Sequence, residues 1–466
     1  MTGSIATIFP RLKRDVPRIL DLAVPILLGQ LAVIAFGVID TAMAARYSTD
    51  DLAALGMASS IFISIYVGLT GILSALNAIA GQLYGANKFP EVGEDTRQTL
   101  WLALCTSVVG IFVLLHPGAF LALGDVSPTI EAKARLYLEI LAWGTPGTMI
   151  MRTYMALHNA ISKPKVITKL QVIGLCLKIP LNYLFIFGGF GIPAMGGPGC
   201  ALASVIVQWF WVISVTVLIC TQKSYQPFGI FSKFSLPNWP RIWNILKLGA
   251  PIGFSYLIEV TSFAFMALFI ARFGTSVLAG HQIIANMGTV LYMIPLSLSI
   301  ATMTVIAQHL GAKQTRDAEQ VGWSAVIFIT SVSVCLGILV WFLQDFLLDL
   351  YSPKPEARAM AHKLFIFIAI YQMADALQVT AAFILRGYRV AFWPMLIYAG
   401  SLWGVGLLGG YLMAFQHIPF VPEYFHGAAG FWTGNSISLA IAACFLLALF
   451  KYTARGIARK GVELPL

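Results

Sequence analysis

The sequence predicts an all-α polytopic membrane protein with twelve transmembrane helices. They form two six-helix lobes related by a pseudo-twofold axis along the membrane normal. Three observations lead to this fold class. Only 11% of the 466 residues are charged, and the mean hydropathy is +0.81. Apolar stretches long enough to cross a bilayer recur along the chain, and its second half repeats the pattern of its first.

The composition excludes most other classes of protein. A soluble domain carries about 25% charged residues, so this chain has too little polar material to cover a globule of its size. The net charge of +10 does not indicate nucleic-acid binding, because the basic residues lie in short segments between apolar runs. No P-loop, nucleophile elbow or dinucleotide-binding motif occurs in the sequence. We therefore expect neither an enzyme nor a bound cofactor.

The twelve predicted spans are centred near residues 30, 67, 108, 148, 177, 210, 258, 293, 332, 374, 404 and 440. An even number of spans places both termini on one side of the membrane. The segments on that side hold 21 Lys and Arg residues, against 7 on the other side. Basic residues are enriched in cytoplasmic loops, so both termini are predicted to be cytoplasmic.

An internal repeat appears when the chain is aligned with itself at an offset of 226 residues. Residues 20–86 match residues 246–312 with 15 identities in 67 positions and no gap, and Pro25 falls on Pro251. Such a register across two spans and a loop is hard to obtain from apolar composition alone. The sequence therefore predicts a duplicated architecture.

The repeat predicts an N-lobe over residues 1–225, a cytoplasmic inter-lobe linker over 226–245 and a C-lobe over 246–466. Each lobe has six spans, so both lobes begin on the same side of the membrane. In transporters built from parallel repeats, the substrate path lies between the halves and access alternates between the two sides. This organisation favours a secondary transporter over a channel or a receptor, which would not need two lobes.

Two carboxylates are predicted at mid-membrane in the C-lobe, where a charge costs about 2.5–3.5 kcal/mol. Glu259 lies near the middle of the seventh span, with Phe263 one turn later on the same face. Asp375 lies at the centre of the tenth span, with Tyr371 one turn before it. If the two acids face each other, they would bind a monovalent cation or share protons. The alternative is that they only accept hydrogen bonds within a packed bundle. The repeat favours a function, because Val33 occupies the position of Glu259 in the first half.

Asp40, in the outer half of the first span, is the third acid of interest. Its counterpart in the second half is Met266. Its carboxylate could face a cavity or cap polar groups near the interface. Arg152 and Lys178 are the cations predicted inside spans, and either could neutralise an acid across the bundle. Such pairing is the main alternative to a cation-binding site.

Taken together, these residues resemble the multidrug and toxic compound extrusion (MATE) family, NorM-like branch. The resemblance covers nearly the whole chain and rests on short motifs. In the first half these are Ala23–Pro25, Val38–Ala44, Gly81–Ala86, Pro180–Tyr183 and Gly196–Ala201. In the second half, besides the two acids, they are Gly249–Ile252, Gly280–Gln282, Tyr292–Pro295 and Leu385–Tyr388.

The resemblance implies a secondary active multidrug efflux transporter that exports bulky cationic and aromatic compounds by alternating access. A coupling cation, Na⁺ or H⁺, would be exchanged for drug. The residues implied for the cation site are Glu259, Asp375, Tyr371 and Asn286, with any Na⁺ held at the two acids. Those implied for the drug cavity are Gln282 and Tyr292, with Asp40 as the matching acid of the first lobe. Phe263 is added to the expected drug cavity because its ring lies on the same face as Glu259 and could contact a flat cationic ligand.

Further expectations follow from the same resemblance. The protein would lie in the bacterial cytoplasmic (inner) membrane as a monomer, in contact with lipid and without nucleic acid. The nearest alternatives are a proton-coupled antiporter of the same fold and a lipid-linked oligosaccharide flippase. A flippase would favour a cavity rich in Arg and Lys, whereas only Arg152 and Lys178 are predicted inside spans. A channel or a non-transporting receptor is the alternative from another class.

Overall fold

The computed structural model describes residues 5–121, 127–351, 353–415, 422 and 426–460. These residues are helical almost throughout, and the pairing of Gly189 with Ile192 is the one isolated β-bridge among them. The chain divides into two compact units. The N unit comprises Pro25–Gly253, and the C unit comprises the residues up to Val24 together with those from Phe254 onward. The predicted fold class is confirmed.

The helices of the N unit pack around α6, which contacts α2, α4 and α8. Helix α1 begins in the C unit and enters the N unit at Pro25, whereas α9 begins in the N unit and leaves it after Gly253. In chain order the elements are α1 (Ile5–Tyr47), α2 (Thr49–Leu73), α3 (Ala75–Gly85), α4 (Phe89–Leu115), α5 (Gly118–Leu121), α6 (Pro128–Ala160), α7 (Pro164–Phe187), α8 (Gly197–Thr221), the 3₁₀ helix η2 (Lys223–Phe228) and α9 (Trp239–Ile270).

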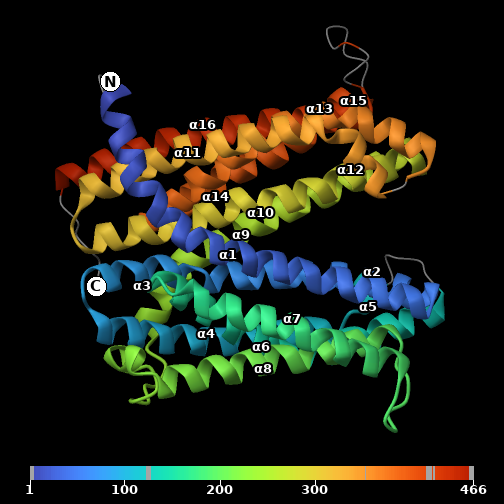
Figure 1. The fold of residues 1–466 in the computed structure, drawn as a ribbon, viewed down its shortest axis with the longest axis horizontal. Coiled ribbons are helices and arrows are strands. Elements are labelled where there is room, and N and C mark those ends of the chain that lie inside the picture. Colours follow the sequence, from blue (N-terminus) through green and yellow to red (C-terminus); the bar gives the residue numbers. More distant parts are fainter. Residues whose placement is uncertain (1–4, 122–126, 352, 416–421, 423–425, 461–466) are drawn as a thin grey trace. The chain divides into compact units, whose positions relative to one another are not determined.

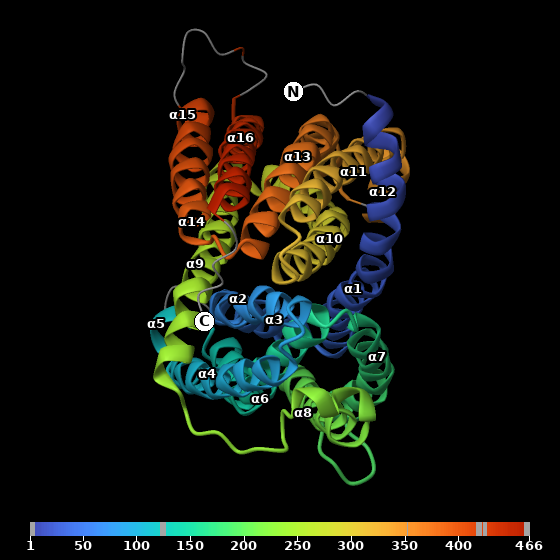
Figure 2. The same cartoon turned by 90° about the vertical axis from the view of Figure 1, so that its left-hand side faces the viewer.

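The C unit is built around α13, which packs against α10, α11 and α16 (Figures 1 and 2). In the most apolar window of α13, 72% of the residues are buried inside the protein. Such burial on all sides makes α13 the central helix of this unit. The elements are η3 (Ala271–Phe273), α10 (Thr275–Gly311), α11 (Thr315–Phe342), α12 (Gln344–Tyr351), α13 (Pro355–Gly387), α14 (Phe392–Tyr398), the π-helix η4 (Ala399–Gly409), α15 (Gly410–Phe415) and α16 (Ala428–Lys460).

The predicted spans correspond to long helices or to helices joined end to end. Among the described residues, 11 helical segments are long and apolar enough to cross a membrane. Three are composite: α2 with α3 covers Thr49–Gly85, α9 with η3 covers Trp239–Phe273, and α14, η4 and α15 together cover Phe392–Phe415. The remaining predicted span, centred near residue 148, lies in α6, a 33-residue helix that carries Arg152. It is outside that set of 11.

The first part of α1 is bound within the C unit. The Arg18 guanidinium donates to the Gln308 side-chain oxygen at 3.1 Å. Nearby, the Ser324 hydroxyl donates to the Asp15 carboxylate, also at 3.1 Å. Residues that begin the first half of the sequence therefore help to build the unit that holds most of the second half.

The first part of α9 is bound in the corresponding way within the N unit. Arg241 forms an ion pair with Asp95 of α4 at 2.8 Å, and Gly249 lies against the backbone carbonyl of Ile72. The chain passes from one unit to the other within α1 and again within α9. These two positions are about one repeat apart, because Pro25 and Pro251 are aligned and lie at or near the unit boundaries. The compact units thus divide the chain inside α1 and α9. The lobe boundaries expected from the sequence, 1–225 and 246–466, stay a prediction.

The segment between α8 and α9 is folded against α4. Arg97 donates through Nε to the Ser235 hydroxyl at 2.9 Å and through Nη1 to the Gly229 carbonyl at 2.5 Å. The Trp101 indole donates to the Ser235 carbonyl at 3.0 Å. The predicted linker therefore has a defined course within the N unit.

A buried carboxylate joins three helices at the opposite end of the N unit. Asp51 of α2 is fully buried and pairs with Lys133 of α6 at 2.6 Å. Its other oxygen accepts the Gly197 backbone N–H, at the start of α8, at 2.7 Å. The preceding Gly196 has φ +64°, a conformation that favours glycine. The glycine-rich motif therefore serves to bring the start of α8 onto the carboxylate.

Gly199, one turn further on, allows α8 to approach the backbone of α7. A Cβ atom at this position would lie 2.6 Å from both the carbonyl carbon and the carbonyl oxygen of Phe185. We predict that Gly199→Ala lowers the free energy of unfolding by about 1–3 kcal/mol through overpacking. The melting temperature of the purified protein in detergent measures this effect.

Gly56→Ala in α2 is the matched control, because a Cβ atom there would meet nothing within 4 Å. Replacing a helical glycine in open space should leave stability unchanged or raise it by up to about 1 kcal/mol. Equal melting temperatures for the two variants would contradict the proposed close approach at Gly199.

Candidate functional site

The two acids predicted at mid-membrane both belong to the C unit, on α9 and α13. Asp375 is 2% exposed. The Gln378 side-chain amide, one turn later on α13, donates to its carboxylate at 2.9 Å. Glu259 is partly exposed on α9 and interacts electrostatically with Asp375. The structure therefore brings the two carboxylates into one region of the C unit.

Tyr292 of α10 connects to this region from a third helix. Its hydroxyl is hydrogen-bonded to the Glu259 carboxylate, and it also interacts electrostatically with Asp375. Tyr371 lies one turn before Asp375 and is close enough to interact with both acids. Carboxylate and phenol groups from α9, α10 and α13 thus lie in one region of the C unit. We refer to Glu259, Asp375, Tyr292 and Tyr371 as the acid–tyrosine cluster.

Aromatic rings extend from the acid–tyrosine cluster towards α16. Phe263 meets Tyr371 edge to face with ring centroids 6.0 Å apart. On its other side, Tyr371 meets Trp432 of α16 at 5.4 Å, again edge to face. His281 of α10 lies 5.8 Å from the same indole. Edge-to-face contacts of this kind stabilise aromatic pairs, so Tyr371 is fixed by rings from two helices.

Asn286 and Gln282 lie on α10, four residues apart, and both are exposed. Side chains at this spacing share one face of a helix. The structure therefore places them together on an exposed face of α10, and it gives neither a contact with the two acids. Their roles in a cation site and a drug cavity stay predictions.

Asp40 belongs to the other compact unit, so it is not part of the acid–tyrosine cluster. It is 8% exposed and forms an ion pair with Lys178 of α7 at 3.1 Å. Of the two cations predicted inside spans, Lys178 therefore neutralises Asp40. Arg152 lies on α6 in the same unit and is partly exposed.

Arg386 is a charged residue near the cluster, although the count of 21 basic residues on the terminal side places it in a cytoplasmic segment over residues 386–392. It lies in the last turn of α13 and is only 4% exposed. Its guanidinium donates to the Tyr256 hydroxyl at 2.8 Å and lies over the Phe383 ring at 4.3 Å. It also interacts electrostatically with Glu259. The available signal was the absence of a helix breaker before Gly387, which lets α13 continue through Arg386.

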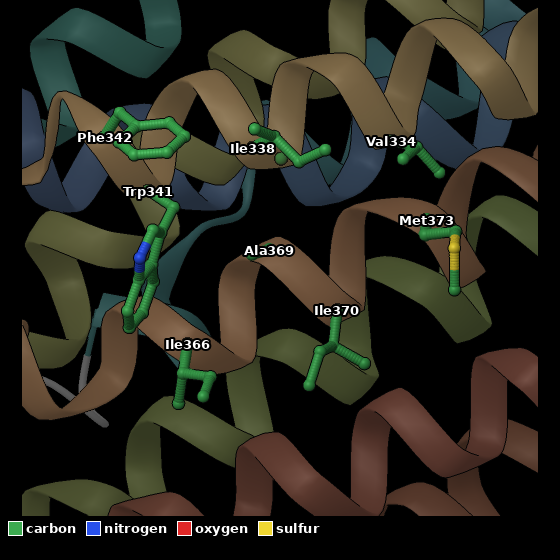
Figure 3. Close-up of a pocket in the computed structure, with 9 residues that line it drawn as sticks. Val334, Ile338, Trp341, Phe342, Ile366, Ala369, Ile370 and Met373 are labelled. Carbon is green, nitrogen blue, oxygen red and sulfur yellow. The ribbon is translucent and has the colours of Figure 1, made fainter.

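A separate apolar groove runs between α11 and α13 (Figure 3). Its walls are residues Val334, Gly337, Ile338, Trp341, Phe342, Ile366, Ala369, Ile370 and Met373. Met373 faces this groove and is 39% exposed, whereas Asp375 two residues later is buried. Because no ionisable residue lines the groove, it is not a candidate for the cation site.

The chemistry available to the acid–tyrosine cluster is that of hard oxygen ligands. Carboxylate, phenol and water oxygens suit alkali and alkaline-earth cations and protons rather than soft transition metals. Within the described part of the chain, no group of three or more His, Cys, Asp or Glu side chains could hold a metal ion. Two acids flanked by tyrosines therefore fit a small monovalent cation better than a transition metal.

Comparison with known proteins matches this chain to the MatE family. The family model matches twice, over residues 25–184 and 251–412. The two matches begin 226 residues apart, which is the offset of the internal repeat.

Curated relatives cover almost the full length of the chain. A probable multidrug resistance protein NorM of Aromatoleum aromaticum is 35% identical over 446 residues, which are 95% of this chain and 94% of that protein. The multidrug resistance protein PmpM of Pseudomonas aeruginosa is 34% identical over 463 residues, covering 97% of this chain and 95% of that protein.

Solved structures share the fold at lower sequence identity. The eukaryotic MATE transporter AtDTX14 superposes with a TM-score of 0.84 at 19% identity, covering 97% of this chain and 99% of that chain. The MATE transporter VcmN of Vibrio cholerae, in its bent form, gives 0.84 at 18% identity, covering 96% and 98%.

The geometry around Arg386 generates a prediction about stability. A guanidinium can stack flat on an aromatic ring while it donates hydrogen bonds in its own plane, a planar geometry that an ammonium lacks. We expect Arg386→Lys to lower the free energy of unfolding by about 1–3 kcal/mol, measured as a fall in melting temperature.

Tyr256→Phe is the matched control, since it keeps the ring beside Arg386 and removes only the hydroxyl. It should cost about 1 kcal/mol, the worth of one hydrogen bond. If Arg386→Lys melted at the wild-type temperature, the stacked and hydrogen-bonded arrangement would be wrong.

Proposed function

This chain is a member of the MatE family, and from that premise we propose that it exports drugs in exchange for a monovalent cation bound at Glu259 and Asp375. The chain is a multi-pass membrane protein and a multidrug efflux transporter rather than an enzyme. The proposal concerns the coupling ion, its site and the class of drug.

The observation that carries the proposal is the balance of charge around the acid–tyrosine cluster. Glu259 and Asp375 interact with each other, and Arg386 is the cation that interacts with Glu259. Two carboxylates and one guanidinium leave one negative charge when both acids are ionised. An uncompensated charge is costly in a low-dielectric interior. One Na⁺ or one H⁺ would remove this cost, which supports a single monovalent coupling ion.

Na⁺ and H⁺ would use the same residues in different ways. A bound Na⁺ would take oxygen ligands from both carboxylates and from the hydroxyl groups of Tyr292 or Tyr371. A proton would bridge the two carboxylates or reside on one of them. The oxygen ligands present are compatible with either ion, so the choice between them requires measurement.

Exchange needs only that cation and drug disfavour each other's binding. Cation binding at Glu259 would release Tyr292 from its hydrogen bond and so change the packing of α9, α10 and α13. Linkage requires that the two ligands weaken each other by the same factor. Each entering cation also gains about 2.3 kcal/mol per 100 mV of membrane potential. This coupling is sufficient to drive export by alternating access.

The proposed substrates are bulky cationic and aromatic compounds. Relatives named as multidrug resistance proteins support this class. Within the C unit, the rings of Phe263, Tyr371 and Trp432 offer stacking surfaces close to carboxylates. Cations bind to such faces by cation–π attraction. Gln282 and Asn286 complete the proposed list of residues that contact drug or cation.

The proposed setting is the bacterial inner membrane, with both termini in the cytoplasm. The excess of Lys and Arg in segments on the terminal side supports this orientation. We propose that the protein works as a monomer, without a resident cofactor and without nucleic acid.

We predict that Glu259→Gln and Asp375→Asn each abolish gradient-driven accumulation of ethidium inside everted vesicles, which is the direction of export. Each variant removes one of the two charges that attract the ion while keeping the size of the side chain. Asp345→Asn is the control, because this acid lies on α12 with its side chain 72% exposed. It should export at the wild-type rate. Export against a gradient by either variant of the cluster would refute the proposed site.

Imposed ion gradients distinguish the two coupling ions. Proteoliposomes loaded with ethidium are given an inward Na⁺ gradient at constant pH, and then an inward pH gradient without Na⁺. A sodium-coupled protein should accelerate efflux by about tenfold or more only in the first case, as expected for a coupling free energy above about 1.4 kcal/mol. Efflux driven only by the pH gradient would identify a proton antiporter. Efflux indifferent to both gradients would exclude cation exchange.

A further inference from the structure

The N unit contains a buried ion pair that the proposed exchange does not use. Asp40 on α1 and Lys178 on α7 lie 3.1 Å apart, with exposed side-chain fractions of 11% and 0%. Asn182, one turn after Lys178, donates its amide to Asp40 Oδ1 at 2.6 Å. The carboxylate is therefore held by two side chains of one helix.

Lys178 is positioned by more than the carboxylate. An ammonium group has three protons to donate. Lys178 also donates to the Cys200 carbonyl at 3.1 Å and to the Ser204 hydroxyl, both on α8. Its ammonium lies 5.5 Å from the centroid of the Phe36 ring. Each proton thus has an acceptor, and the ammonium is fixed among α1, α7 and α8.

A fully buried lysine with satisfied protons has no reason to leave its site during turnover. The lysine occupies the position beside Asp40 at which a free cation would otherwise neutralise the carboxylate. Removing one member of a buried pair leaves the other charge unpaired, which is far costlier than removing both. The N unit therefore differs from the acid–tyrosine cluster, where the charges do not balance.

We propose that Lys178 is a built-in counter-cation that keeps Asp40 neutralised throughout the transport cycle. The first half of the protein then needs no ion from solution, and the coupling cation binds in the C unit alone. Lys178 acts through Asp40 and is a positioning residue that sets how many ions are exchanged. This last consequence rests on the proposed function, whereas the permanent pairing does not.

A double-mutant cycle tests the proposal. Asp40→Asn and Lys178→Met each leave one buried charge unpaired, so each should reduce ethidium export by roughly tenfold or more. The variant carrying both substitutions leaves no charge and should recover to within about threefold of wild type. Arg135→Met is the control for the substitution itself. Its ion pair with Glu131 is 42% exposed on both sides, so wild-type export is expected.

The opposite outcome of the cycle is equally clear. If the double variant is as inactive as Asp40→Asn alone, then Asp40 itself carries an ion or contacts drug, and the proposal is wrong. Melting temperatures of the four proteins accompany the transport assay. The single variants should melt several degrees below wild type and the double variant close to it.

The pH profile gives a readout that a structural role alone would not change. The ionisable groups facing Asp40 are Lys178 of α7, Tyr137 of α6 and Cys200 of α8. In Lys178→Met, a proton on Asp40 can replace the missing ammonium. Export by this variant should therefore rise by several-fold as the pH is lowered, and the double variant should show no such rise. Parallel pH profiles for the two variants would contradict the proposal.

Direct ion binding separates failure of this inference from failure of the proposed function. If Na⁺ is the coupling ion, binding of radioactive Na⁺ to purified protein should persist in the double variant and disappear in Glu259→Gln. Loss of binding in the double variant would overturn the inference and leave the acid–tyrosine cluster in place. Retained binding in Glu259→Gln, together with recovery of the double variant, would overturn the cation site and leave the Asp40–Lys178 pair in place.

Discussion

The cost of burying charge away from water governs how this protein is organised. A buried ion must be paired or hydrogen-bonded, and most of the buried charges described here obey this rule. Asp51 is neutralised by Lys133, Asp40 by Lys178, and Arg386 is stacked and hydrogen-bonded by its aromatic neighbours. Asp375 departs from the pattern, because an amide and a second acid interact with it. We interpret this departure from electroneutrality as the mark of the proposed ion site.

The two halves of the sequence use one helical framework for different chemistry. Val33 stands where the second half has Glu259, and Met266 stands where the first half has Asp40. The two halves therefore share a helical framework and the aligned Pro25 and Pro251, but not these acids. In our interpretation, Lys178 neutralises Asp40 in the first half, whereas the acids of the second half bind a cation from solution. An asymmetric pair of this kind couples transport to one ion without a second site to load.

Much of the fold could be predicted from the sequence, because membrane spans appear as local apolar stretches and the repeat appears as matches at a fixed offset. Apolar length, the excess of basic residues on one side and the 226-residue offset each depend on residues near one another or at a fixed spacing. The choice of Glu259 and Asp375 as candidate site residues followed from the cost of charge in a span. The partner of Lys178 did not, since it depends on how α1 and α7 pack. Arg386 was misplaced because a motif with glycine resembles a loop, whereas the helix continues to Gly387. The course of the segment before α9 also depends on contacts with α4, which no local pattern records.

The exchange of helix segments between the units bears on how the protein is made. The N unit includes residues 239–253, which leave the ribosome only after every other part of that unit. The C unit includes the start of α1, which is synthesised first and must wait for residues from Phe254 onward. Neither half of the sequence therefore contains a complete unit. A fragment ending before α9 would lack the first part of α9, which belongs to the N unit, and the second fragment would lack the first part of α1, which belongs to the C unit. Two fragments divided in the segment before α9 should therefore mature only when both are expressed in the same membrane. Each half of the chain thereby completes the unit formed mainly by the other half, so a truncated chain cannot form two complete units.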